Sequence, residues 1–515
     1  MGTHGMVASS QPLASQVGLS ILMQGGNAAD AAVATAAALA VTEPCSTGLG
    51  GDCFALYYEA ATQQVTAINA SGRAARGLSI DYLERNGLMG AWQERHALTA
   101  TVPGACSGWC GVVERHGSMP LGTVLAPAIR LAEEGYPVHP VAAYVWALDE
   151  ALLQKNGSDE LLISGRAPRP SQRFRNPGMG RTLRAIAEGG ADAFYRGEIA
   201  GTIVDALQRF GHVMEREDLA SHQAEWVEPI STVYHGVRIW ECPPNGVGIA
   251  ALLALNIYRE LPYHPPLSVE RVHLQIEAMR LAFADTHWYV ADPAFSQAPI
   301  AELLSDRYAA QRRAMVDPER ALTSIEHGFP DAGSNTVYFC VVDEAGNACS
   351  FINSNFNRFG TGIVPPGVGF SIQNRGFGFS LDRDHPNALA PGKRPYHTII
   401  PGMMTRLDGS LYGPFGVMGT VMQPQGHFQV AVGLIDDERD PQTVLDQPRF
   451  RVEETSILVE PGMPAEMLAA RGHRLQLVHG NDRRDFGRGQ IIIRQADGTL
   501  IAGSDMRADG CAMGW

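Results

Sequence analysis

The hydrophobic pattern changes character once along the chain, near residue 336. Before it, apolar residues recur mostly at helical spacing, over residues 12–24, 28–42, 121–134, 181–188, 199–210, 248–259 and 269–283. Two short apolar runs, 54–58 and 65–68, are typical of a hairpin beside the first helices. After residue 336, strand-like runs dominate at 337–342, 348–353, 398–405 and 489–494, with helices expected at 420–436 and 464–471. The pattern predicts layers of helices packed on sheets.

Thr336 stands at the boundary between these two parts. A linker, residues 322–335, leads into it, and the residues that follow it are apolar as in a buried strand. If the chain were cut before Thr336, a free α-amine would share the residue with the hydroxyl. Such an amine has a pKa of about 7.7–8.0 and can act as the base for its own side chain. On this stretch alone, an ordinary strand start is the simpler interpretation.

Composition narrows the class of protein. The hydrophobic content is 45%, and 18% of residues are charged, as in an ordinary soluble globular protein. The formal net charge of −14 argues against binding to nucleic acid, which needs a basic face, and disfavours a membrane surface. The eight cysteines form no regular framework, and the N-terminus lacks a secretory pattern. A cytoplasmic location is expected.

Short motifs occur in a fixed order along nearly the whole chain. They occupy residues 6–8, 25–32, 50–52, 102–104, 335–336, 341–343, 346–348, 359–363, 393–395, 416–419 and 423–425. Together they resemble the γ-glutamyltransferase family of N-terminal nucleophile hydrolases. The resemblance implies an α+β fold of four layers, αββα. It also implies a precursor that cuts itself into a large subunit, 1–335, and a small subunit, 336–515, associated as a heterodimer, alone or as a dimer of heterodimers. No cofactor is expected.

The resemblance also implies roles at the reacting centre. The Thr336 hydroxyl would attack the carbonyl of Asn335 to release the new N-terminus, and would later carry an acyl ester from an amide substrate. Backbone N–H groups of Gly419 and Thr420 align with the family's oxyanion donors. Ser354 aligns with a second hydroxyl beside the nucleophile.

The substrate pocket departs from the transpeptidases of this family. Their aspartate for the substrate ammonium falls at Gly378, and a neighbouring polar residue becomes Arg375. Because arginine pairs with carboxylates and cannot bind an amine, the pocket should prefer a carboxylate without an ammonium. A surface or structural arginine is the alternative for Arg375. The family's own carboxylate-binding arginine lies nearest to Arg73, two positions away.

Three further positions are expected to line the substrate pocket. His397 and Thr398 align with a pair of family serines, and His397 can also be read as a structural histidine. Asn355 flanks the family's pocket asparagine, which is Phe356 here; the aromatic ring narrows the space for a glutamyl chain.

These departures look most like the oxamate amidohydrolase branch of the family. We therefore expect hydrolysis of a small anionic amide, with oxamate giving oxalate and ammonia. One alternative is a γ-glutamyl hydrolase or transpeptidase acting on glutathione, or a cephalosporin-type acylase. An alternative of another class is an unprocessed, inactive binding protein.

One pair of side chains outside these motifs has metal-binding spacing. His273 and Glu277 stand four residues apart in an expected helix, but the sequence shows no third ligand. An ordinary helix position is the simpler interpretation, and no metal site is expected.

Overall fold

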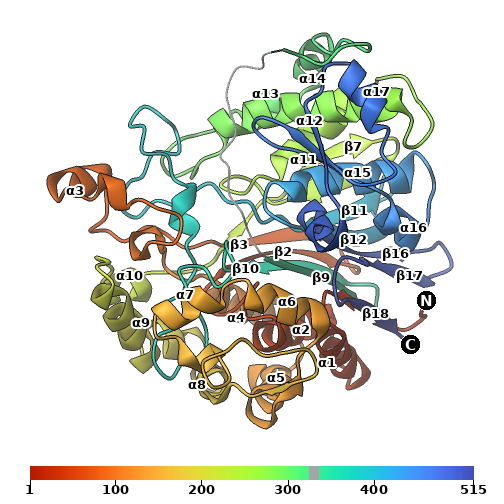
Figure 1. Cartoon of the computed structure of the whole chain (residues 1–515). Coiled ribbons are helices and arrows are strands. Elements are labelled where there is room, and N and C mark those ends of the chain that lie inside the picture. Colours follow the sequence, from red (N-terminus) through yellow and green to blue (C-terminus); the bar gives the residue numbers. More distant parts are fainter. Residues whose placement is uncertain (324–335) are drawn as a thin grey trace.

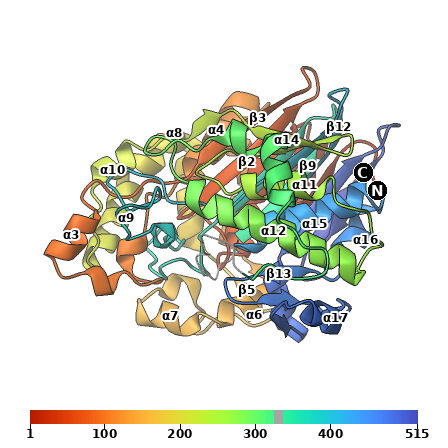
Figure 2. The same cartoon turned by 90° about the horizontal axis from the view of Figure 1, so that it is seen from above.

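A computed structural model describes residues 1–323 and 336–515; Asn335 and most of the expected linker lie outside the described residues. Two β-sheets stack face to face, and helices cover the outer face of each (Figure 1). The chain ends lie side by side (Figure 2) because the first and last strands pair. The four-layer αββα arrangement expected from the sequence is confirmed.

The first sheet has seven strands, and Thr336 begins one of its inner strands. Its order is β18-β1-β9-β10-β2-β3-β6, and every neighbouring pair is antiparallel. β9 therefore has hydrogen-bonded neighbours on both sides, β1 from the start of the chain and β10 after the turn. The strands are β1 (Met6–Ser9), β2 (Asp52–Glu59), β3 (Gln64–Ala70), β6 (Glu225–Val227), β9 (Thr336–Val342), β10 (Ala348–Ser354) and β18 (Cys511–Gly514).

The second sheet has six strands in the order β17-β16-β12-β11-β8-β7. They are β7 (Ile230–Tyr234), β8 (Val237–Glu241), β11 (Gly402–Arg406), β12 (Leu411–Met418), β16 (Arg488–Arg494) and β17 (Leu500–Ser504). The middle of the chain was expected to be mostly helical, so β7 and β8 correct that expectation. In the structure, buried and half-buried residues alternate along β8 and the second half of β7, as is typical of a strand with one face in the core. The strand expected at 398–405 begins only at Gly402, after Pro401.

Helices cover both outer faces (Figure 1). Against the seven-stranded sheet lies α2 (Ala28–Thr42), which is buried along its whole length and begins with a capping box of Asn27 and Asp30. α1, α4, α5 and α8 complete this layer, and α11, α12 and α15 cover the six-stranded sheet. Their bounds are α1 (Pro12–Met23), α4 (Ala105–His116), α5 (Leu121–Glu134), α8 (Pro177–Tyr195), α11 (Ile249–Tyr258), α12 (Val269–Tyr289) and α15 (Met422–Ile435).

Shorter elements surround this sandwich. They are α3 (Ile80–Arg85), α6 (Pro140–Ala147), α7 (Glu150–Lys155), α9 (Glu198–Arg209), α10 (Arg216–Ala220), α13 (Ile300–Leu303), α14 (Asp306–Arg313), α16 (Pro441–Asp446), α17 (Ala465–Ala470), β4 (Tyr136–Pro137), β5 (Arg173–Phe174), β13 (Phe450–Val452), β14 (Ile457–Val459) and β15 (Leu475–Leu477). Within the described residues, no helix combines the length and apolarity needed to span a membrane.

The two sheets meet where β12 crosses β9. A Cβ atom at Gly416 would lie 2.4 Å from the ring of Tyr338, so only glycine allows this approach. Tyr338 is fully buried and its hydroxyl bonds Ser350, 2.8 Å away. This contact brings the end of β12 against the strand that Thr336 begins.

Candidate active site

Three polar side chains share one row across the seven-stranded sheet. Ser354 of β10 pairs directly with Thr336 of β9 on one side and with Asp52 of β2 on the other. Directly opposed residues of antiparallel strands point to the same face of a sheet. Backbone pairing thus aligns a nucleophile candidate, a second hydroxyl and a carboxylate, and all three are fully buried.

Ser354 is placed to donate a hydrogen bond to Thr336. The two hydroxyl oxygens lie 2.9 Å apart. Ser354 Oγ also accepts from the Phe356 N–H at 2.9 Å and from Arg375 Nη2 at 3.3 Å. Either hydroxyl of this pair could be the donor; when Ser354 donates, its hydrogen points to Thr336 Oγ1. That bond stabilises negative charge as it develops on the Thr336 oxygen.

Arg375 brings a buried positive charge next to the hydroxyl pair. Its side chain is fully buried, and Nη1 donates to Thr398 Oγ1 at 2.8 Å. The guanidinium lies 4.4 Å above the ring centre of Phe356. Its Nε–H has no partner among the described residues. Burial lowers the pKa of Arg375 to about 9, and the Asp52 charge acts in the opposite direction.

Asp52 is the carboxylate of this row, and it accepts hydrogen bonds from several protein groups. Oδ1 accepts from the N–H groups of Gly72 at 2.9 Å and Gly104 at 3.1 Å, and from Gln373 Nε2 at 2.9 Å. Burial raises the pKa of Asp52 to about 7, against the lowering effects of the Arg375 charge and these hydrogen bonds. In the sequence, Asp52 is the last residue of the 50–52 motif, and its position after two glycines at a strand start was the available signal of a role.

His397 contacts Asp52, which is the strand partner of Ser354 in this row. Its Nε2 lies 3.0 Å from Asp52 Oδ2, and its Nδ1 accepts weakly from the Ile399 N–H at 3.4 Å. Burial holds the pKa of His397 well below its usual range, with the charges of Arg375 and Arg394 adding to the effect. A neutral ring that donates to Asp52 orients the carboxylate, and the expected role of His397 in substrate binding stays a prediction.

Gly419 and Thr420, the expected oxyanion donors, connect β12 to α15. Both have positive φ angles, +131° and +49°, and such a conformation is uncommon for threonine. They lie between the last residue of β12 and the first turn of α15, and the start of a helix favours negative charge. Their catalytic role stays a prediction.

The remaining expected residues lie in different surroundings. Arg73 is held by Asp292 at 3.2 Å and Glu225 at 2.9 Å, and the structure does not bring it into the row of Thr336. Asn355 is buried, and its Oδ1 has no hydrogen-bond partner among the described residues. Asn335 lies outside the described residues. The roles of Arg73 and Asn355 in substrate binding stay predictions.

The assembled site combines a candidate hydroxyl nucleophile, Thr336, with a fixed cation, Arg375. The carboxylate in the row, Asp52, has four protein donors, so it is poorly placed to accept a substrate ammonium. The arrangement suits acyl transfer from an anionic amide.

Comparisons with known proteins show which proteins this chain is similar to. The sequence model of the family "Gamma-glutamyltranspeptidase" matches residues 14–515. A glutathione hydrolase-like proenzyme of Bacillus subtilis is 35% identical, covering 100% of this chain and 99% of its own. The oxamate amidohydrolase proenzyme of Klebsiella pneumoniae is 33% identical, with 100% and 99% covered. The crystal structure of a cephalosporin acylase from Bacillus halodurans superposes with a TM-score of 0.92 at 44% identity, covering 100% and 96%.

Proposed function

Because the chain belongs to the γ-glutamyltranspeptidase family of N-terminal nucleophile hydrolases, we propose that it cuts itself between Asn335 and Thr336 and then works as an amidohydrolase. The names of two relatives, both proenzymes, support processing. Cleavage gives residues 1–335 and 336–515, which stay together because both sheets contain strands from each part. The new α-amine on Thr336 becomes the base for the hydroxyl.

The reaction proceeds through an ester on Thr336. The α-amine takes the hydroxyl proton as Thr336 Oγ1 attacks the amide carbon, and the Ser354 hydroxyl stabilises the attacking oxygen. The C–N bond breaks, and the leaving nitrogen takes the proton and departs as ammonia. Water then attacks the ester carbon, which releases the acid and restores the Thr336 hydroxyl.

From the position of Arg375 we infer that the acyl part of the substrate bears a carboxylate. Its guanidinium is fully buried within hydrogen-bond reach of Ser354, the partner of the nucleophile. Contacts to Ser354 and Thr398 leave hydrogens on all three guanidinium nitrogens for a further anionic partner. A carboxylate bound there lies next to the scissile carbonyl, which favours a very short acyl chain.

Oxamate fits these requirements, since its carboxylate is bonded directly to a primary amide. Water would convert it to oxalate and ammonia. The likeness to the oxamate amidohydrolase of Klebsiella pneumoniae supports this substrate. A γ-glutamyl substrate would add an ammonium, for which Asp52 is poorly placed because four donors already bind it.

A second candidate is the hydrolysis of a longer anionic acyl amide such as a glutaryl amide. It is favoured by the 44% identity to the cephalosporin acylase of Bacillus halodurans. The same Arg375 would then bind the distal carboxylate of the acyl chain.

A denaturing gel and a substrate panel test these proposals. The wild-type protein should run as two bands, and Thr336→Ala as one full-length band without activity. Ammonia release from oxamate should exceed that from glutamine, and oxamate should be consumed faster than glutathione or a glutaryl amide. Processing of Thr336→Ala would refute the nucleophile, and turnover of glutathione without turnover of oxamate would refute the substrate.

A further inference from the structure

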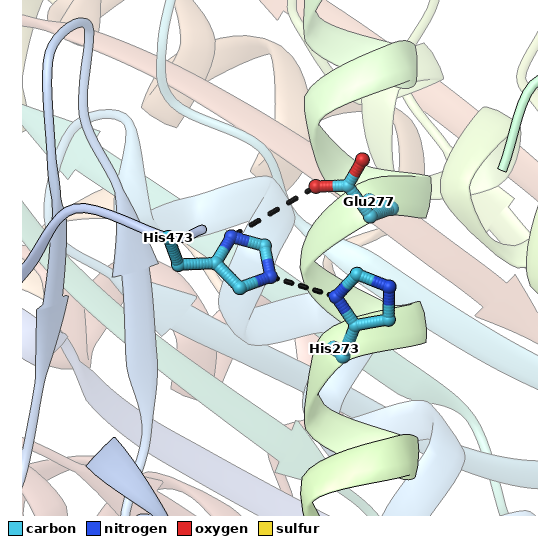
Figure 3. Close-up of side chains that lie close together, drawn as sticks. All are labelled: His273, Glu277 and His473. Carbon is cyan, nitrogen blue, oxygen red and sulfur yellow. Dashed lines mark hydrogen bonds and ion pairs between the residues drawn. The ribbon is translucent and has the colours of Figure 1, made fainter. Parts of the chain in front are cut away.

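The structure adds a third metal-ligand side chain to the pair that the sequence placed on one helix. His273 and Glu277 of α12 face His473, which follows α17, and all three side chains are buried. Figure 3 shows His473 pointing at both partners. The facing ligand atoms lie within 4.8 Å of one another.

The hydrogen bonds around His273 direct one lone pair into this cluster. Its Nε2 lies 2.7 Å from the carbonyl oxygen of Asp317. Because a carbonyl only accepts, Nε2 carries the ring hydrogen, and the neutral ring presents an unprotonated Nδ1 to His473. A second-sphere carbonyl that fixes the tautomer in this way is usual for metal-binding histidines.

Glu277 is held in the same manner. Its Oε2 accepts from the Leu322 N–H at 2.9 Å, and its Oε1 accepts from Arg280 at 2.7 Å. These partners fix the carboxylate with Oε1 toward His473 Nδ1, 3.9 Å away. Hydrogen-bonded carboxylates are likewise common among metal ligands.

His473 cannot satisfy both neighbours as a neutral ring. Its Nε2 lies 2.7 Å from the unprotonated Nδ1 of His273, and its Nδ1 faces the Glu277 carboxylate without making a hydrogen bond. A neutral imidazole has one ring hydrogen for these two acceptors. A cation among the three ligands would satisfy the remaining lone pairs.

We propose that His273, Glu277 and His473 form a binding site for a divalent transition-metal ion, best suited to Zn²⁺. Two imidazoles and one carboxylate are a common zinc ligand set that leaves a fourth position open. His473 and Arg280 also line a cavity of about 560 Å³, so the proposed site borders open space on the side of His473. Two imidazoles on one zinc hold their nitrogens roughly 3.3 Å apart, so the two rings must separate slightly on binding.

The site would join the two polypeptides of the processed protein, and this part of the proposal rests on the proposed cleavage. His273 and Glu277 precede the cut, and His473 follows it. Their second-sphere partners, Asp317 and Leu322, lie near the end of the first polypeptide. A bound ion would therefore fasten that end to the second polypeptide.

Metal analysis of untagged full-length protein tests the site. The metals are first removed, the protein is reloaded with Zn²⁺, and the excess is washed away. Mass spectrometry should then find one zinc per pair of polypeptides in the wild type. His273→Ala and His473→Ala should each weaken zinc binding by more than about 100-fold, beyond the usual effect of second-sphere changes. His479→Ala, which removes an exposed histidine of the same region, should bind as wild type does. Equal zinc in wild type and both ligand variants would overturn the site.

Two further measurements test the site when the ligand variants do not fold or when the chain is not cleaved. X-ray absorption of zinc-loaded wild type should show two imidazoles and an oxygen ligand on the zinc. A set of zinc ligands without histidine would overturn the proposal. Thr336→Ala, tested as a single chain, should bind zinc with wild-type affinity, because the three ligands do not depend on the cut. If this variant does not bind while processed wild type does, the ligands assemble differently and the proposed geometry is wrong.

Discussion

Ser354 Oγ lies 2.9 Å from Thr336 Oγ1, and the two residues are direct partners on adjacent strands. Phe356 and Arg375 donate to Ser354 Oγ, and the Ser354 hydroxyl can in turn donate to Thr336, the proposed nucleophile. The expected second hydroxyl is thus in contact with Thr336, and its role as a donor to that residue stays a prediction.

Ser354→Ala should lower kcat by about 100-fold, the usual effect of losing one hydrogen-bond donor at a developing anion. KM should change little, because the bond strengthens in the transition state. Ser350→Ala is the matched control: it removes a buried hydroxyl of the same strand that bonds Tyr338 instead. It should cost about 1 kcal/mol of stability and leave kcat intact. Equal kcat values for the two variants would contradict the assigned role.

Arg375→Lys should raise KM for an anionic substrate at least about tenfold, because lysine cannot form the two-pronged pair with a carboxylate. Arg73→Lys provides the comparison, since Arg73 is held by Asp292 and Glu225. It should leave KM near the wild-type value. Steady-state kinetics decide which of the two arginines binds the substrate, and the reverse pattern would restore Arg73 as the ligand.

The pH dependence of KM should report the ionisation of Asp52. Its pKa is raised to about 7 by burial. As pH rises through 7, Asp52 gains a negative charge beside Arg375, so a substrate carboxylate binds less well. KM should therefore rise between pH 6 and 8, by up to about tenfold per pH unit. This rise should vanish in Asp52→Asn but persist in Asp292→Asn, which removes a buried carboxylate that contacts Arg73 instead. A wild-type KM independent of pH would refute this assignment.

Gly416→Ala should destabilise the protein by about 1–3 kcal/mol, the cost of an added methyl group in a filled core. The new Cβ would lie 2.4 Å from the Tyr338 ring, between the two sheets. Gly90→Ala is the control, because no atom lies within 4 Å of a Cβ at that exposed site. It should change stability by less than about 0.5 kcal/mol. Urea unfolding measures both, and equal midpoints would show that the sheets can separate to admit the methyl.

The sequence predicted the elements with strong local patterns. α2 and α5 begin and end where the apolar spacing indicated, and β9 begins at Thr336 as expected. The strands β7 and β8 were missed, although residues 237–241 alternate as a half-buried strand does. These strands lie between longer helices. Their sheet partner β11 follows about 160 residues later in the chain, so the nearby sequence does not indicate which strand they pair with.

The candidate site could be predicted only in part, for a similar reason. Thr336, Ser354 and Arg375 followed from the order of motifs, and the structure brings these three together. Asp52 was missed because its place beside Ser354 depends on strand pairing across some 300 residues. The ligand role proposed for His473 could not be predicted for the same reason, because its partners His273 and Glu277 lie 200 and 196 residues earlier.

The position of β9 between β1 and β10 has a consequence for the protein after cleavage. Each polypeptide supplies ladder partners to the other, so neither has a complete sheet of its own. Pulling them apart would expose both cores, and subunit exchange between molecules should be as rare as global unfolding. Once made, the cut therefore leaves Thr336, the proposed nucleophile, where folding of the intact precursor put it.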